Sequence, residues 1–289
     1  MAETLLLKRI SRSWRVLATR DLSFSYGKHS VFKNFNLDVP EGQVCLITGI
    51  NGVGKSTLLR LIAGVLKPAS GKIVFSERLA KSPKRKIGFI SDMLSFYESL
   101  TVAQGIDFHK DIYGLHKIDD SLIRHTKIGY SQKIKELSLG QRTIYHLSLI
   151  LSLEPEILLI DEVIHSIDAY LRKLFLDQLI QLMSQRRITV VMVNLNFRDI
   201  EHLVERVILL KSGEIAVDEE IHSLKAKVKK IISTRPPTCL SVLSQNNFSD
   251  HAESYVYPFS EALRDDIEGE IVDLDLTEIV AAFIGGEYA

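Results

Sequence analysis

The sequence predicts an α/β fold built around a parallel sheet. Apolar, strand-like runs alternate with helical periods from residue 44 to residue 210; the run at 157–160 is apolar at every position, and the run at 188–193 is apolar except at Thr189. Strands that are buried on both faces of a parallel sheet have this continuous apolar character, because helices cover both faces. A glycine-rich turn at 49–54 separates the first run from a helical period, so a strand, loop and helix open this region.

Composition limits the class of protein. The chain has 289 residues, which is enough for one large domain and a small one. It carries 36 basic and 36 acidic residues, and this neutral balance argues against a general nucleic-acid partner, which favours a basic surface. Two cysteines, Cys45 and Cys239, are too few for a disulfide framework and fit a reducing compartment; we expect Cys45 to be a buried thiol.

No membrane-spanning segment is expected. The best candidate run, 147–160, is interrupted by Glu154, Pro155 and Glu156. The apolar group at 5–7 is too short for a secretory signal. We therefore expect a cytoplasmic protein that does not cross a membrane by itself.

The glycine-rich turn has the spacing of a phosphate loop. Gly49, Gly54, Lys55 and Ser56 fill the pattern G-x-x-x-x-G-K-[ST], in which backbone N–H groups surround phosphates, the lysine reaches the β and γ phosphates, and the hydroxyl ligates Mg²⁺. The helix that follows directs its N-terminal dipole at the anion. An accidental turn is the alternative, but the flanking strand and helix favour nucleotide binding. We assign the remaining contacts with the nucleotide to Asn51 and Gly52 in the loop and Thr57 in the helix.

The apolar run at 157–160 ends in two carboxylates, Asp161 and Glu162. The carboxyl end of a central parallel strand is the ligand side of the sheet. Asp161 is predicted to hold Mg²⁺, and Glu162 is predicted to orient or deprotonate a water molecule. The alternative is that either residue is an ordinary acid at a helix N-terminus.

Two further motifs have both a structural and a functional interpretation. Ser138, followed three residues later by Gln141, forms a capping box ahead of an apolar run, so a helix begins there. Strand-like pieces between 15 and 39 carry Tyr26 beside a glycine, either as a surface aromatic or as a ring that stacks on a purine.

The chain is expected to divide near Leu224. Residues 1–224 form the nucleotide-binding domain, with a helical insertion that gives a helical subdomain at about 93–153. Residues 225–289 form a small α+β appendage, with strands expected at 230–234, 239–243, 254–257 and 270–274 and helices at 261–268 and 276–284.

The order of these motifs resembles the ATP-binding cassette (ABC) ATPases over residues 15–220, and more specifically the single-cassette subunits of bacterial exporters. The resemblance implies a phosphate-loop ATPase core with an antiparallel β subdomain and a helical insertion. It also implies that two cassettes meet head to tail, with ATP and Mg²⁺ between them. Ser138, Gly140 and Gln141 would then face the γ-phosphate of the partner cassette's ATP, Tyr26 would stack on adenine, and Asp168 would lie at the dimer interface. The catalytic residues would be Glu162 and Lys55.

Three positions depart from the family pattern. Asp92 replaces the usual glutamine, residues 163–167 read VIHSI, and Leu195 replaces the usual histidine. His165 and His202 lie off the aligned position and are expected at the surface. Because leucine offers no donor to the γ-phosphate, we expect slow hydrolysis in a homodimer.

The resemblance implies an ATP-hydrolysing subunit of a membrane transporter, most consistent with an exporter. Such a subunit would lie on the cytoplasmic face of the membrane against a separate transmembrane subunit and a second cassette, in a homodimer or heterodimer. Two alternatives stay open: a catalytically weak regulatory half of an asymmetric ABC complex, and an ABC ATPase that acts outside transport. The substrate cannot be deduced, because specificity lies in the membrane subunit.

Overall fold

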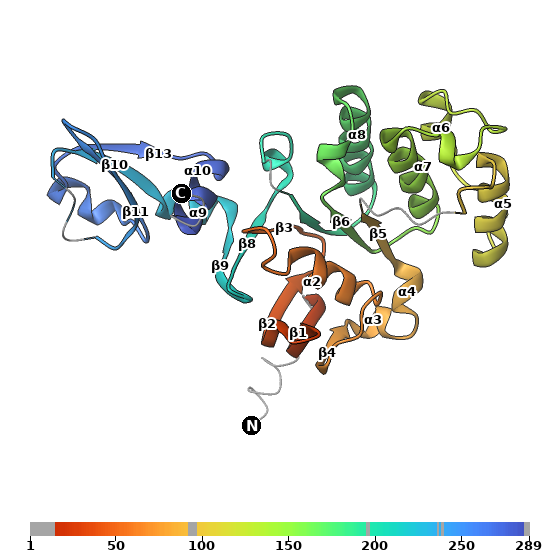
Figure 1. Ribbon diagram of the computed structural model, residues 1–289, viewed down its shortest axis with the longest axis horizontal. Helices are drawn as coiled ribbons and strands as arrows, with labels where there is room; N and C mark the ends of the chain where they lie inside the picture. Colours follow the sequence, from red (N-terminus) through yellow and green to blue (C-terminus); the bar gives the residue numbers. More distant parts are fainter. Residues whose placement is uncertain (1–14, 92–96, 195–196, 236, 238–239, 286–289) are drawn as a thin grey trace. The chain divides into compact units, whose positions relative to one another are not determined.

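A computed structural model describes residues 15–91, 97–194, 197–235, 237 and 240–285 (Figure 1). The chain divides into two compact units. The first comprises Met1–Cys45 and Ser56–Asn194, and the second comprises Leu46–Lys55 and Leu195–Ala289. Strand β3 (Val44–Gly49) passes from the first unit to the second.

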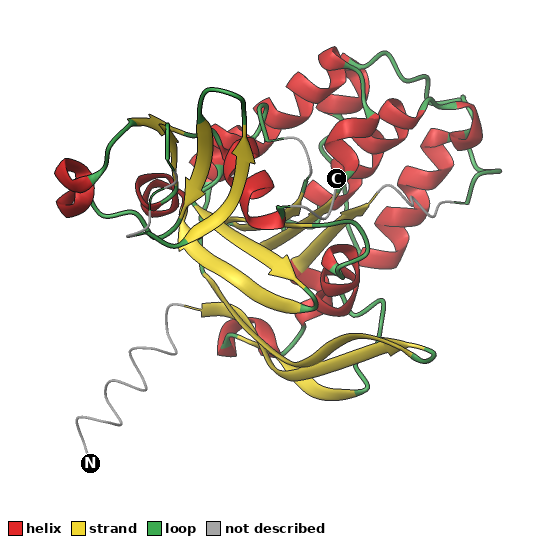
Figure 2. Ribbon diagram, turned by 60° about the vertical axis from the view of Figure 1, so that its left-hand side comes forward, coloured by secondary structure: helices red, strands yellow, loops and turns green. Residues whose placement is uncertain are grey.

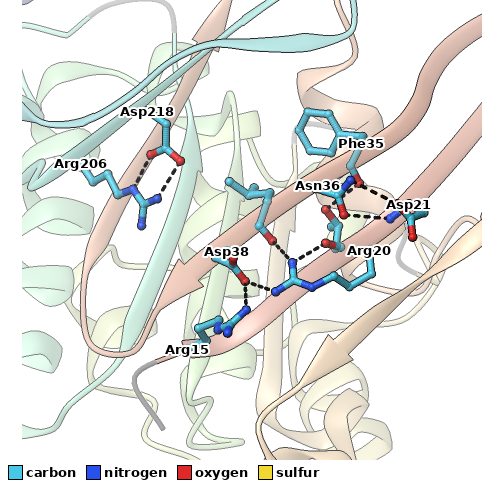
Figure 3. Close-up of polar contacts among 10 residues, drawn as sticks. Arg15, Arg20, Asp21, Phe35, Asn36, Asp38, Arg206 and Asp218 are labelled. Carbon is cyan, nitrogen blue, oxygen red and sulfur yellow. Dashed lines mark hydrogen bonds and ion pairs between the residues drawn. The ribbon is translucent and has the colours of Figure 1, made fainter. Parts of the chain in front are cut away.

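The first unit contains a three-stranded antiparallel sheet of order β2-β1-β4. Its strands are β1 (Arg15–Tyr26), β2 (His29–Pro40) and β4 (Ser70–Phe75). Asp38 on β2 accepts hydrogen bonds from Arg15 and Arg20 on β1 (Figure 3). Burial opposes ionisation of this carboxyl, but the hydrogen bonds from Arg20 and Arg15 lower the pKa of Asp38. These contacts fix the pairing of the two long strands.

A parallel sheet segment in the same unit consists of β5 (Ile87–Ser91), β6 (Ile157–Asp161) and β7 (Thr189–Val193), with β6 in the middle. Every residue of β6 and β7 is buried, as the largely apolar runs at 157–160 and 188–193 predicted. The register pairs Asp161 with Val193. The end of β6, where the two carboxylates follow, therefore lies level with the end of β7.

The helices of this unit include the predicted insertion. They are α2 (Lys55–Ile62), α3 (Glu77–Ala80), α4 (Pro83–Lys86), α5 (Val102–Tyr113), α6 (Ser121–His125), η1 (Ile134–Glu136), α7 (Leu139–Leu151), η2 (Val163–Ser166) and α8 (Ala169–Gln185). Figure 2 draws the helices in red, and Figure 1 shows α5, α6 and α7 grouped together. Their shared core includes Val102, Ile123, Ile134 and Tyr145. The α5 helix lies within the helical subdomain expected at about 93–153, with a capping box at Thr101 and a left-handed C-cap at Gly114.

The second unit pairs β8 (Arg206–Lys211) with β9 (Glu214–Glu220) in an antiparallel hairpin. The guanidinium of Arg206 on β8 donates two hydrogen bonds to the carboxylate of Asp218 on β9, at 2.5 and 2.7 Å (Figure 3). A short helix, α9 (Ile221–Lys227), follows. Near it, Glu219 accepts hydrogen bonds from the hydroxyl of Tyr257 at 2.6 Å and the ammonium of Lys227 at 2.7 Å. These bonds tie the hairpin to the segments that follow it.

The C-terminal residues form an antiparallel sheet of order β11-β12-β10-β13. The strands are β10 (Lys229–Ser233), β11 (Val242–Asn247), β12 (Ala252–Val256) and β13 (Glu270–Asp273), and the chain continues into α10 (Leu276–Ile284). Its core contains Ile231, Val256 and Phe259. The helix α10 has the bounds that its period predicted.

Several elements differ from the predictions. The helix expected at 261–268 is the 3₁₀ helix η4 (Glu261–Asp266), and a single 3₁₀ turn, η3 (Glu201–Leu203), precedes β8. The strand expected at 239–243 begins at Val242 and continues through polar residues to Asn247, because its ladder with β12 outweighs its low strand propensity. Cys45 is fully buried, as expected, whereas Cys239 lies outside the described residues.

Candidate functional site

The phosphate loop follows β3 and leads directly into α2. Gly49 has φ of 142°, and a Cβ there would lie 2.3 Å from the carbonyl oxygen of Leu210, so glycine is required. Gly52 and Gly54 also have positive φ, at 81° and 112°. The positive φ angles therefore explain why glycine occurs at all three predicted positions.

Lys55 begins α2 and is only 4% exposed. Its ammonium donates hydrogen bonds to the carbonyl oxygens of Gly49 at 2.9 Å and Ile50 at 3.0 Å. The cation is thus held within the loop that the sequence assigned to phosphate. Asn51, at the tip of the loop, is exposed.

Ser56 and Asp161 are brought together although they lie 105 residues apart. The Ser56 hydroxyl donates to Asp161 Oδ1 at 2.7 Å, and Asp161 is 1% exposed. Hydroxyl and carboxylate oxygens are the donor types that Mg²⁺ prefers, so this pair fits the ion that the motif implies. Among the described residues, no group of three or more His, Cys, Asp or Glu side chains is placed to hold a metal. Two protein oxygens match Mg²⁺, which usually keeps water and phosphate ligands.

Tyr26 and Thr57 lie beside each other. The two hydroxyl oxygens are 3.5 Å apart, and Tyr26 packs edge-on against Phe24 with ring centroids separated by 4.9 Å. The Tyr26 side chain is 48% exposed, whereas Thr57 is 8% exposed. The aromatic ring is therefore available to a ligand beside the first turn of α2.

Glu162 adopts a left-handed backbone conformation with φ of 52°, which is uncommon for a residue with a side chain. Its N–H donates to the carbonyl oxygen of Val193 at 3.1 Å, which fixes it at the end of β6. Asn194, the next residue after Val193, is 1% exposed. The backbone of Glu162 is therefore held in place at the carboxyl end of the parallel strands.

The predicted capping box at the start of α7 is confirmed. The Ser138 hydroxyl accepts from the N–H of Gln141 at 3.2 Å, and the Gln141 side-chain oxygen accepts from the N–H of Ser138 at 3.1 Å. Gly140 is buried, and a Cβ on it would lie 2.6 Å from Leu171 Cδ1. Gly140 therefore permits close packing of α7 against α8, a role that the sequence did not indicate.

Asp168 is the N-cap of α8. Its Oδ1 accepts hydrogen bonds from the N–H groups of Tyr170 and Leu171, both at 3.0 Å. The residue is exposed, and this capping role was not predicted. A Ser, Thr, Asp or Asn immediately before a helical period is the signal that could have identified it.

Arg60 is a second residue near the site that sequence analysis missed. It lies on α2, and its Nη2 is 4.0 Å from Asp161 Oδ2. Asp92 and Leu195, two of the three departures from the family pattern, lie outside the described residues, whereas His202 is exposed, as expected. No helix among the described residues is long and apolar enough to cross a membrane.

Known proteins resemble the chain over most of its length. A sequence model of the family described as ABC transporter matches residues 32–165. The energy-coupling factor transporter ATP-binding protein EcfA1 of Oenococcus oeni is 31% identical over 226 residues, covering 73% of this chain and 81% of EcfA1. The bacitracin transport ATP-binding protein BcrA of Bacillus licheniformis is 29% identical over 228 residues, covering 75% of this chain and 74% of BcrA.

Solved structures share the fold. An ATP-binding subunit of an ABC transporter superposes with a TM-score of 0.66 at 22% identity, covering 73% of this chain and 92% of that subunit. CbiO1 of Clostridium perfringens, part of the ABC transporter complex cbiONQ, superposes with a TM-score of 0.58 at 24% identity, covering 72% and 89%. Together with the phosphate loop and the Ser56–Asp161 pair, these similarities show that the chain belongs to the ABC transporter family, as the ATP-binding subunit of a transporter and an ATPase whose hydrolysis of ATP is coupled to transport.

Proposed function

We propose that this subunit binds ATP with Mg²⁺ through the phosphate loop, Ser56 and Asp161. The observation that carries the proposal is the 2.7 Å contact between the Ser56 hydroxyl and the buried Asp161 carboxylate. With ATP bound, Mg²⁺ would neutralise phosphate charge, and Ser56 and Asp161 would supply its protein oxygens. Lys55 would turn its ammonium toward the phosphates, and Tyr26 would stack on adenine.

Glu162 is the proposed general base. It directly follows Asp161, the last residue of β6, whose carboxylate would hold the metal ion. A carboxylate there can accept the proton of an attacking water, whereas an amide of the same size cannot. Glu162→Gln should therefore retain ATP binding and suppress hydrolysis, as measured by nucleotide binding and phosphate release.

A second cassette is the proposed partner in the catalytic unit. Support comes from the N-terminal end of α7, where Ser138 is exposed and Leu139 is 45% exposed, and from Tyr170 beside Asp168, which is 63% exposed. Size-exclusion chromatography of Glu162→Gln with Mg²⁺ and ATP tests this. A stable dimer supports head-to-tail pairing, and a protein that remains monomeric argues against homodimer formation.

The transmembrane subunit is proposed to contact α5. Tyr97 is 65% exposed, Phe108 is 41% exposed and Ile112 is 54% exposed, and the rings of Tyr97 and Phe108 meet edge to face at 5.1 Å. Exposed apolar clusters of this kind mark contact surfaces. Phe108→Ser should reduce recovery of the chain with membranes, whereas Ile180→Ser, at an exposed apolar residue of α8, is the matched control. Such binding would place the chain on the cytoplasmic face of the membrane.

Export is the proposed direction of transport. Residues 225–289 are proposed as a separate small domain that extends a cassette at residues 1–224. The supports are the resemblance of this extension to single-cassette exporter subunits and the relatives named for bacitracin and lantibiotic transport. Relatives named for sulfate and spermidine import are similarly close, so uptake into inside-out vesicles is the deciding measurement. ATP-dependent uptake by such vesicles corresponds to export from the cell.

The second candidate function is a catalytically weak half of an asymmetric pair. The observation that favours it is the replacement of two phosphate-sensing residues by Asp92 and Leu195. Steady-state ATPase activity of the purified chain, beside Leu195→His and Asp92→Gln, tests it. Slow turnover that rises on substitution supports a degraded site, and brisk turnover that falls on substitution argues for sensing residues particular to this chain.

A further inference from the structure

Helix α2 contacts both oxygens of the Asp161 carboxylate. The Ser56 hydroxyl donates to Oδ1 at 2.7 Å, and Arg60 Nη2 lies 4.0 Å from Oδ2. Ser56 and Arg60 are four residues apart on the helix, so their side chains leave it on the same face, one turn apart. A single helix therefore places a hydrogen-bonding hydroxyl and a guanidinium near the two oxygens of this carboxylate.

The pair is asymmetric in its exposure to water. The Asp161 side chain is 2% exposed, and the Arg60 side chain is 29% exposed. A buried carboxylate is strongly disfavoured unless charge or hydrogen bonds compensate it. The long stem of arginine lets the guanidinium reach a buried partner while part of it stays hydrated. Arg60 can thus supply positive charge to Asp161 while its own guanidinium loses little of its hydration.

The backbone of Arg60 is itself fixed. Its carbonyl oxygen accepts the N–H groups of Val65 at 2.9 Å and Leu66 at 3.1 Å, where the chain leaves α2 through Gly64 with φ of 73°. Such bonds satisfy a carbonyl at the C-terminal end of a helix. The guanidinium therefore extends from a stable position.

We propose that Arg60 is a positioning residue of the magnesium site, which holds Asp161 through Oδ2 so that Oδ1 stays directed toward the metal. The inference rests on the proposed role of Ser56 and Asp161 as ligands of Mg²⁺. If the Ser56 oxygen ligates the ion, it no longer holds Asp161 as it does in the 2.7 Å hydrogen bond to Oδ1. The attraction between Arg60 and Oδ2 remains available, since it involves the other oxygen.

The test measures equilibrium binding of a fluorescent ATP analogue while MgCl₂ is varied. Arg60→Met removes the charge and keeps much of the aliphatic stem, and Arg60→Lys keeps the charge. We expect Arg60→Met to raise the half-saturating Mg²⁺ concentration about tenfold and Arg60→Lys to raise it less than about threefold, consistent with loss of one charge contact. Affinity for the analogue at saturating Mg²⁺ should change little. A general structural defect would instead weaken binding at every Mg²⁺ concentration.

Two further variants are matched controls. Arg78→Met removes an arginine that is 57% exposed and pairs with Glu41 and Glu156, and it should leave the Mg²⁺ requirement unchanged. Arg60→Met in an Asp161→Asn background should add no further shift, because the charge that Arg60 restrains has been removed. A shift of the same size in that background would show that Arg60 acts on something other than Asp161.

Ser56→Ala separates failure of this inference from failure of the magnesium site. If Ser56→Ala raises the Mg²⁺ requirement and Arg60→Met leaves it unchanged or lowers it, the positioning role is overturned and the metal site stands. If neither variant changes the requirement, the assignment of Ser56 as a ligand is wrong, and the inference fails with it.

Discussion

Gly140→Ala is predicted to disturb the packing of α7 against α8. The added Cβ would lie 2.6 Å from Leu171 Cδ1 and 3.4 Å from Ile167 Cγ2. Ordinary carbon contacts are about 3.5 to 4.0 Å, so Leu171 must move by roughly 1 Å or change rotamer. Leu171 is 6% exposed, so most of its surface is covered by other residues. Overpacking of this kind costs about 1 to 3 kcal/mol of unfolding free energy.

The expected functional effect follows from the position of the helix. Gly140 lies in the first turn of α7, whose N-terminus we propose to face the nucleotide of a second cassette. A displaced first turn should weaken ATP-dependent dimerisation, while ATP binding by the monomer, which uses the phosphate loop, stays near normal. Urea unfolding, nucleotide binding and size-exclusion chromatography of one preparation measure the three quantities.

A matched substitution and a compensating one make this test specific. Gly129→Ala places a Cβ 3.7 Å from Gln132 Cβ, an ordinary contact, and should be close to neutral. Leu171→Val combined with Gly140→Ala should recover part of the lost stability, because it removes the atom that the new Cβ approaches. If Gly140→Ala leaves stability unchanged but abolishes dimerisation, the glycine serves only the partner's nucleotide and the packing argument is wrong.

Three other substitutions have defined outcomes. Lys55→Ala should abolish or severely weaken ATP binding with the fold intact, because it removes the cation held in the loop; unchanged affinity in a nucleotide-binding assay would contradict the phosphate-loop assignment. Tyr26→Ala should weaken ATP binding by about 1 to 3 kcal/mol with little change in the preference among purines, and an unaltered affinity would leave the ring without a role in stacking. Burial, with a smaller contribution from His109, lowers the pKa of His146 to about 4 from its ordinary 6.5. The unfolded chain therefore binds a proton at a higher pH than the folded chain, so this histidine should lower stability progressively as the pH falls from about 6.5 to 4, by at most about 3 kcal/mol. His146→Leu should flatten that part of the urea-unfolding profile, and His125→Gln, at an exposed histidine, should not.

The sequence was sufficient where one local pattern determines one element. The buried strand β6 and the helices α5 and α10 follow continuous apolar or helical periods, and the start of α7 follows from the Ser138 and Gln141 spacing. The phosphate loop was equally accessible, because its glycines and its lysine lie within seven residues. In each case the physical cause acts between residues that are close along the chain.

Long-range contacts determined what could not be predicted. Strand β11 ends in the polar residues Ser244–Asn247, and only its pairing with β12 makes it a strand. Arg60 carried a signal, since it lies four residues after Ser56 on one helix face, but the sequence could not say that Asp161 would lie beside both. The sequence likewise cannot show that a glycine is needed for close packing until the neighbouring residue is known. Leu171, the neighbour of Gly140, lies 31 residues away along the chain.

The register of the parallel strands bears on the prediction of slow hydrolysis. Asp161 pairs with Val193, and the N–H of Glu162 bonds to the carbonyl oxygen of Val193, so Asn194 follows at the same level as Glu162. Asn194 is buried, and its amide can donate and accept hydrogen bonds but cannot carry a proton or a positive charge. The proposed base, Glu162, therefore directly follows Asp161 at the strand end where Asn194 follows Val193, and the family pattern has a titratable ring one residue after Asn194. We predict that transition-state charge on the γ-phosphate is less stabilised where leucine replaces that ring, which is the physical basis for the slow turnover that we predict for this chain alone.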